Sequence, residues 1–188
     1  MRKELISGEA IYVIHDFLSA SECDGHIGAS EAVGFEEATI TTRTGAEMRK
    51  EIRNNTRVIL DVPRLAADLF ERAAPLLPAA IGDWSLTGLN ERFRYYRYDP
   101  GETFRPHLDG SFRRSETERS LLTFMVYLNE GCAGGSTLFH SPTGEDIEIV
   151  PSLGMALVFV HRQLHEGAPV LSGRKYVLRT DVMYERRP

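Results

Sequence analysis

Residues 119–161 read RSLLTFMVYLNEGCAGGSTLFHSPTGEDIEIVPSLGMALVFVH, a stretch in which short β-prone runs alternate with turn-like segments. The runs are rich in Val, Ile, Leu, Phe and Tyr, and the segments NEGCAGG, SPTGE and PSLG carry the Gly, Pro, Asn and Ser residues typical of turns. The same texture begins at Leu89 and extends to RKYVLRTDVMY near the end of the chain. Many short strands at close spacing predict a sandwich or barrel. A double-stranded β-helix (jelly roll) of about eight strands fits best, so the chain is predicted to be mainly β.

The region before Leu89 differs, because it contains helical patterns as well as strands. AIYVIHDFL (residues 10–18) predicts a strand, and Ser19 with Glu22 stands in capping-box register for a helix that reaches about Val33. Asp61 is predicted to cap a second helix over LAADLFERAAPLL. One face of that helix carries Leu65, Leu69, Ala73 and Leu76 at helical spacing. We expect both helices to cover one outer face of the β core. Residues 36–42 and RVIL (57–60) are further candidate strands.

Length and composition predict one folded domain over residues 1–188, with an N-terminal support (1–88) and a jelly-roll core (89–188). Hydrophobic residues make up 42% of the chain and charged residues 26%, which argues against disorder. No apolar run approaches the roughly 20 residues that span a bilayer, and the first ten residues lack the apolar core of a signal peptide. A cytoplasmic protein without a membrane partner is therefore expected.

Charge and cysteine content narrow the function classes. The net charge is -5 and the pI is about 5.7, which gives no global electrostatic reason to bind nucleic acid. Cys23 and Cys132 lie far apart, so neither a disulfide framework nor a thiolate zinc site is indicated.

PHLDGS (residues 106–111) carries the first candidate metal ligands. In an extended segment His107 and Asp109 point to the same side, so an imidazole and a carboxylate converge. Non-haem iron(II) oxygenases bind their metal with two histidines and one carboxylate and leave positions open for co-substrate and dioxygen. The residues alone leave the third ligand open among His140, His161 and His165.

Several ordered motifs together resemble the iron(II)- and 2-oxoglutarate-dependent dioxygenases, and within them the prolyl 4-hydroxylase type. The motifs are YDPGETFRPHLD, VYLN followed by GGSTLF, VPSLGMALVF and HEGAPVLSGRKYV, and they cover roughly residues 89–184. The resemblance implies iron(II), 2-oxoglutarate and dioxygen as cofactor and co-substrates. It places the second histidine at His165, because P-V and then G-x-K follow it, and makes His107, Asp109 and His165 the catalytic metal ligands. A carboxylate at position 109 implies hydroxylation, whereas Ala or Gly there would have implied halogenation.

The resemblance also implies a co-substrate pocket. Lys175 matches the lysine that binds the distal carboxylate of 2-oxoglutarate, Tyr127 a tyrosine that hydrogen-bonds it, and Tyr98 a tyrosine that lines the pocket near the metal. By strand alternation Arg179 lies on the same face as Lys175, where a second cation helps to hold the keto acid in some relatives, while Arg174 points the other way. Thr137 and Phe139 are expected to line the same cavity.

Two features bear on the substrate, which is expected to be a prolyl residue in a protein or a small molecule. LNERFRYYRY (residues 89–98) is a basic aromatic strand, and its alternating row of Arg94, Tyr96 and Tyr98 is a candidate to face the cavity and meet a carboxylate. RTGAEMRKEIRNN (residues 43–55) has the composition of a mobile loop, and we expect it to close over substrate.

Two other classes of function remain open at this point. One is a non-catalytic, cupin-like jelly-roll module that binds a small carboxylated ligand or a partner protein. The other is a metal-dependent hydrolase or isomerase, which would use the same ligands but not Lys175. The sequence leaves the oligomeric state open.

Overall fold

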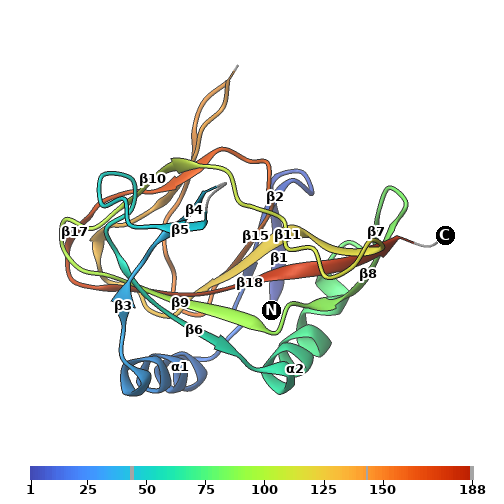
Figure 1. Cartoon of the computed structure of the whole chain (residues 1–188), viewed down its shortest axis with the longest axis horizontal. Coiled ribbons are helices and arrows are strands. Elements are labelled where there is room, and N and C mark those ends of the chain that lie inside the picture. The colour runs from blue at the N-terminus through green and yellow to red at the C-terminus, as the bar shows by residue number, and fades with distance from the viewer. Residues whose placement is uncertain (43–44, 143, 187–188) are drawn as a thin grey trace.

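The computed structural model describes residues 1–42, 45–142 and 144–186, and it confirms the mainly β, jelly-roll architecture (Figure 1). An antiparallel large sheet has the strand order β1 (Arg2–Ser7), β2 (Ile11–His15), β15 (Ala156–Val160), β11 (Glu118–Tyr127), β18 (Lys175–Arg186), β9 (Arg92–Tyr98), β6 (Thr56–Asp61) and β3 (Glu36–Glu37). At the β18 side it also includes β8 (Trp84–Leu89), which pairs with β7 (Ala80–Ile81).

A smaller sheet lies over one end of the large sheet and has the order β10 (Phe104–His107), β16 (His165–Gly167), β13 (Thr137–Phe139) and β14 (Ile147–Ile149). Two separate two-stranded pairs complete the strands: β12 (Ala133–Gly134) with β17 (Val170–Ser172), and β4 (Ile40–Thr42) with β5 (Gly45–Glu47). The helices are α1 (Ala20–Val33), α2 (Pro63–Ala73) and the 3-10 turn η1 (Ala74–Leu76). No described helix is long and apolar enough to cross a membrane.

Both faces of the large sheet are buried, and strand alternation assigns each residue to one of them. On β18, Tyr176 and Leu178 join the core cluster that includes residues of α1 and α2, whereas Val177 joins the cluster between the two sheets. Lys175 and Arg179 share the face of Val177, as predicted, and Arg174 is an exposed partner of Asp99. Helices α1 and α2 lie together below the large sheet in Figure 1. The pocket residues Lys175 and Arg179 therefore lie on the opposite face, which the small sheet covers.

The two helices begin differently from one another. The predicted capping box of α1 is confirmed, because Ser19 Oγ accepts from the Glu22 amide and the Glu22 carboxylate accepts from the Ser19 amide. The predicted cap of α2 is wrong. Asp61 ends strand β6 and binds the Arg92 guanidinium through both carboxylate oxygens, at 2.8 and 2.9 Å, so α2 starts only at Pro63. Proline suits a first helical position because its missing N–H has no partner there.

The C-terminal end of the charged segment 43–55 is packed against the fold, unlike the mobile loop that its composition predicted. Arg53 and Asn55 are buried, and the Arg53 Nε donates to Asn55 Oδ1 over 2.7 Å. Residues 43 and 44 lie outside the described residues, and closure of the segment over substrate stays a prediction.

Gly154 supports the junction between α1 and the large sheet, and we predict that Gly154→Ala destabilises the fold. Its φ is +71°, and a Cβ there would lie 1.9 Å from the Leu18 carbonyl oxygen. Left-handed strain and overpacking together are expected to cost about 2–5 kcal/mol in the free energy of unfolding. Gly8 is the matched control, because its φ is +53° but no atom lies within 4 Å of a Cβ. Denaturant unfolding should show about 1 kcal/mol for Gly8→Ala, and equal losses for the two variants would contradict the role of the Leu18 contact.

Candidate metal centre and co-substrate pocket

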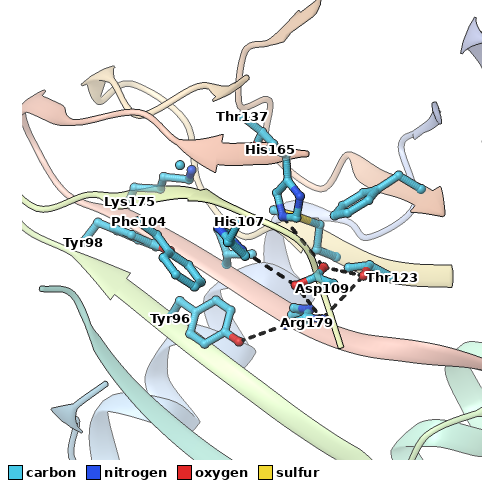
Figure 2. A pocket seen from close by; sticks show the side chains of 14 residues that line it. Tyr96, Tyr98, Phe104, His107, Asp109, Thr123, Thr137, His165, Lys175 and Arg179 are labelled. Atoms are coloured by element: carbon cyan, nitrogen blue, oxygen red, sulfur yellow. Dashed lines mark hydrogen bonds and ion pairs between the residues drawn. The ribbon is translucent and has the colours of Figure 1, made fainter. Parts of the chain in front are cut away.

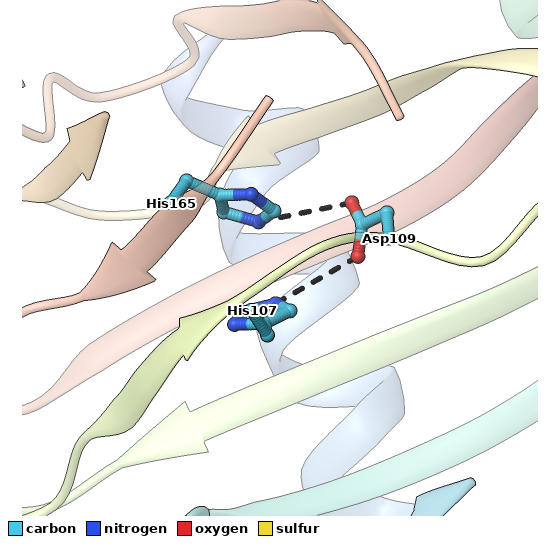
Figure 3. Close-up of side chains that lie close together, drawn as sticks. All are labelled: His107, Asp109 and His165. Carbon is cyan, nitrogen blue, oxygen red and sulfur yellow. Dashed lines mark ion pairs between the residues drawn. The ribbon is translucent and has the colours of Figure 1, made fainter. Parts of the chain in front are cut away.

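The candidate metal ligands converge where the small sheet covers the large one. His107 ends β10 and lies directly opposite His165 of β16, because these two residues are cross-strand partners. Asp109 follows β10, and its amide donates to the carbonyl of His161 over 3.1 Å, which ties this segment to the residues before β16. One ligand atom from each of His107, Asp109 and His165 lies within 4.8 Å of the other two (Figure 3). The three predicted ligands are therefore brought together.

Main-chain hydrogen bonds orient both imidazoles. His107 Nδ1 lies 2.8 Å from the carbonyl of Arg105, and His165 Nδ1 lies 2.8 Å from the carbonyl of Gln163. A carbonyl accepts only, so each Nδ1 carries the proton and each Nε2 keeps a lone pair. Burial lowers the pKa of His107 to about 4 and also lowers the pKa of His165, so both rings are neutral at pH 7. Both Nε2 atoms face Asp109, at 3.7 and 3.8 Å from its oxygens.

Asp109 is ionised and held on both oxygens. The Thr123 hydroxyl donates to Oδ2 over 2.6 Å, and Arg179 Nη2 lies 3.1 Å from Oδ1. Burial alone would raise the pKa of Asp109, but the Arg179 guanidinium, His165 and the Thr123 hydrogen bond outweigh it and keep that pKa well below its usual range. Two neutral imidazoles and a carboxylate are the donor set that non-haem iron(II) requires.

A buried polar chain stands behind Asp109, and the sequence did not reveal it. The single hydroxyl proton of Thr123 goes to Asp109, so the contact of 3.0 Å between Thr123 and His161 requires His161 Nδ1 to donate. His161 Nε2 then accepts from Ser120 Oγ at 2.8 Å. His161 is thus a support for the site, whereas His140 pairs with Asp146 near the surface. Strand alternation with Met125 and Tyr127 was the available signal for Thr123.

Lys175 lies in the same pocket as the three ligands (Figure 2). It is 2% exposed, its Nζ donates to the Gly135 carbonyl over 2.5 Å, and it lies 5.2 and 5.4 Å from the ring centres of Tyr98 and Tyr127. Burial lowers its pKa to about 8. A buried ammonium without a carboxylate partner among the described residues is suited to bind an anion that enters the pocket.

The other predicted pocket residues divide into those that line the pocket and those that stand behind it. Tyr98 and Thr137 line it. Tyr127 is fully buried, with its hydroxyl 2.7 Å from Thr137 Oγ1, so it supports the wall at this point. The expectation for Phe139 was wrong. Phe139 lies on the same face of β13 as Thr137, but its ring packs against the rings of Phe159 and His165, with centres 5.0 and 5.7 Å away, and these two residues form the described lining in its place.

Arg179 lies at the Asp109 end of the pocket and Lys175 at the other (Figure 2). Arg179 also contacts the hydroxyls of Tyr96 and Thr123, each at 3.5 Å, and the carboxylate of Asp181 at 3.4 Å. Contact of Arg179 with a keto acid stays a prediction, while its support of Asp109 follows from the geometry.

Comparison with known proteins agrees with this geometry. Residues 93–180 match the family model of the 2OG-Fe(II) oxygenase superfamily. These residues form a 2OG-Fe(II) oxygenase domain. Prolyl 4-hydroxylase 1 of Arabidopsis thaliana is 25% identical over 94% of this chain and 70% of its own length. The resemblance to prolyl 4-hydroxylases is thereby confirmed.

Solved structures share the fold of the oxygenase. A Pseudomonas putida prolyl-4-hydroxylase superposes with a TM-score of 0.70 at 20% identity, covering 95% of this chain and 94% of the other. A Trichoplax adhaerens prolyl hydroxylase, solved with a hypoxia inducible factor peptide fragment, gives 0.70 at 17% identity over 95% and 84% of the two chains.

The residues of the oxygenase fit its cofactor and co-substrates, which are iron(II), 2-oxoglutarate and dioxygen. His107, Asp109 and His165 would hold the metal, and Lys175 provides the buried cation that a dicarboxylate requires at its far end.

Thr123 is predicted to position Asp109, and Thr123→Val should weaken metal binding about 10- to 100-fold, as losses of groups that orient metal ligands typically do. Thr180→Val is the matched control, because Thr180 is equally buried on the same sheet but donates to the Asn90 carbonyl at 2.6 Å. Titration of the metal-free variants with manganese(II) measures the difference. A similar loss of affinity in both variants would assign the effect to general destabilisation.

Proposed function

We propose that this oxygenase hydroxylates a prolyl residue of a peptide or protein. Iron(II) with 2-oxoglutarate and dioxygen supplies the chemistry, in which 2-oxoglutarate is converted to succinate and carbon dioxide and a C–H bond is hydroxylated. The observation that carries the proposal is the presence of His107, Asp109, His165 and buried Lys175 in one pocket. The prolyl substrate is supported by the similarity to Arabidopsis prolyl 4-hydroxylase 1 over nearly the whole chain.

The side chains of the pocket have separate tasks in this proposal. His107, Asp109 and His165 would hold the metal, and a set of three protein ligands would leave it able to bind co-substrates. Lys175 would bind the distal carboxylate of 2-oxoglutarate, and Tyr98 would line the pocket beside it, since its ring centre lies 5.2 Å from the Lys175 ammonium. Apolar walls from Met125, Phe159 and Val177 exclude water from the reacting groups.

The test is product analysis with purified protein, iron(II), 2-oxoglutarate and air. A panel of proline-containing peptides should gain one oxygen atom on proline, with one succinate formed for each hydroxylation. Free proline is included to test for a small-molecule substrate. Hydroxylation of free proline but of no peptide would contradict the proposed peptide substrate and indicate a free amino acid instead. Product formation without dioxygen would support a hydrolase or isomerase instead. The non-catalytic binding module is not favoured by the comparisons.

We further propose that the enzyme works in the cytoplasm, as the composition suggests. Cell fractionation with an antibody against the chain tests this, and recovery in a membrane or secreted fraction would contradict it.

A further inference from the structure

A second, outer cavity of about 530 Å³ opens next to the metal ligands. It shares Tyr96, Phe104, His107, Asp109 and Arg179 with the co-substrate pocket, so a molecule in it would reach the reacting centre. Its further walls come from β6, β9 and the segments before β6 and after β10. This cavity is therefore where the part of a substrate next to the hydroxylated carbon would lie.

Arg53 forms part of the wall and is held rigidly. Only 4% of the residue is exposed, and its guanidinium lies between the rings of Tyr96 and Phe104, 4.4 Å from the centre of each. Phe104 in turn stacks on His107, with ring centres 3.5 Å apart. Arg53 Nη2 is buried without a hydrogen-bond partner, although a guanidinium offers five N–H donors. An unpartnered buried donor at a cavity wall indicates a group that binds there.

Arg57 and Arg94 add two more cations from the same face of the large sheet. Arg57 is the cross-strand neighbour of Tyr96, and its guanidinium donates to the carbonyl and hydroxyl of Thr39, at 3.1 and 2.6 Å. Burial and the nearby Arg53 lower the pKa of Arg57, and Tyr96 and the cross-strand neighbour Glu36 offset part of this effect. Arg94 lies 3.4 Å from the carboxylate of Asp181.

The charge of the cavity is unbalanced. Among its described lining residues, the guanidinium groups belong to Arg53, Arg57, Arg94 and Arg179, and the carboxylates to Asp109 and Asp181. Both carboxylates are already paired with Arg179, and Asp109 is also a metal ligand in the proposed function. Within the described part of the chain Arg53 and Arg57 form no ion pair at all. An excess of forked N–H donors in a partly enclosed cavity favours a carboxylate ligand.

We propose that this cavity binds a substrate carboxylate, and that the substrate is a peptide with an aspartate or glutamate side chain within one or two residues of the target proline. The inference rests on the proposed prolyl hydroxylation and names its substrate class. Arg53 and Arg57 bind the carboxylate, Arg94 contributes long-range attraction, and the peptide backbone enters beside Tyr96 and Phe104. The carboxylate could also come from the end of a chain, and the experiment separates the two sources.

The experiment compares three peptides that differ only in one charge. The first is capped at both ends and has Asp next to Pro, the second has Asn in place of Asp, and the third keeps Asn but ends in a free carboxylate after Pro. Affinity is measured by fluorescence anisotropy on protein loaded with manganese(II) and 2-oxoglutarate, and KM is measured with iron(II). Wild type should prefer the Asp peptide about 10- to 100-fold, the range expected for a charge-assisted hydrogen bond.

Two variants locate the preference. Arg57→Gln should reduce it to a few-fold, and Arg57→Lys, which keeps the charge, should retain more of it than Arg57→Gln. Arg92→Gln is the matched control on the adjacent strand, because Arg92 is exposed and pairs with Asp61 at the surface. It should leave the preference at the wild-type value.

The outcomes separate this inference from the proposed function. Equal KM values for Asp and Asn peptides that are both hydroxylated would overturn the acidic substrate and leave prolyl hydroxylation standing. Tight binding of the Asp peptide without hydroxylation of any peptide would support the acidic site and overturn the proposed reaction. Preference for the free chain end alone would overturn the side-chain assignment, as would an unchanged Asp preference in Arg57→Gln.

Discussion

Replacing Asp109 with Ala is expected to abolish hydroxylation. Asp109 is the only anionic member of the three ligands, so the variant would offer the metal two neutral imidazoles. Loss of a group that merely orients a ligand typically costs 10- to 100-fold, so loss of the ligand itself should lower turnover by more than about 100-fold. Asp109→Asn keeps the shape of the side chain and should be similarly inactive, which separates loss of charge from loss of packing.

The measurement combines turnover with an anaerobic titration. Iron(II) and then 2-oxoglutarate, added to metal-free protein, should produce the weak visible absorption of a chelated keto acid in wild type but not in either Asp109 variant. Asp83→Ala is the control, because its side chain is 75% exposed in a surface ion pair with Arg186. Wild-type turnover in Asp109→Ala would sink the oxygenase mechanism at this site.

Replacing Lys175 with Met is expected to weaken 2-oxoglutarate binding about 10- to 150-fold. Methionine fills a similar volume, so the change removes the ammonium group and little packing. Because Lys175 is buried and donates only to the Gly135 carbonyl, its charge is free to attract the distal carboxylate. KM for 2-oxoglutarate should rise much more than kcat falls. Lys3→Ala is the control, since Lys3 pairs with Glu9 at the surface, and equal KM values for Lys175→Met and wild type would remove Lys175 from the site.

The affinity for 2-oxoglutarate should also depend on pH. Burial lowers the pKa of Lys175 to about 8, so the side chain is charged below that pH and becomes neutral above it. A dianion prefers the charged form, so the dissociation constant should be constant below about pH 8 and should rise above it. Calorimetric titration of the manganese(II)-loaded protein between pH 6.5 and 9.5 (roughly one and a half units on either side of this pKa) measures the trend. In Lys175→Met the rise above pH 8 should disappear, and its persistence there would point to another group.

The sequence was most informative where neighbouring residues determine the geometry. His107 and Asp109 are two positions apart on an extended segment, so their convergence follows from strand alternation alone. The same rule placed Lys175 and Arg179 on one face. His165 is different, because it meets His107 across the β10–β16 pair, and only the resemblance to a family selected it from the other histidines.

What the sequence missed depends on contacts between distant strands. Thr123 contacts Asp109 from the large sheet. Arg53 contacts Tyr96 from residues 43–55, a segment whose charged composition predicted a mobile loop. Strand register decides both contacts, and the local pattern does not specify register between strands far apart in the chain. The prediction that Asp61 caps α2 was wrong for a related reason. Pairing of β6 with β9 brings Arg92 to Asp61, and this tertiary contact outweighs the local capping preference.

The hydrogen bonds of the two imidazoles affect which substitutions the site can tolerate near its ligands. His107 and His165 each donate to a main-chain carbonyl two residues earlier, and a carbonyl is present whatever side chain stands there. Substitutions around either histidine that preserve the strand therefore preserve its tautomer and direction. Asp109 differs, because its oxygens are held by the side chains of Thr123 and Arg179, which a substitution would remove. Mutational tolerance should thus be broad around the histidines and narrow at the two residues that hold the carboxylate.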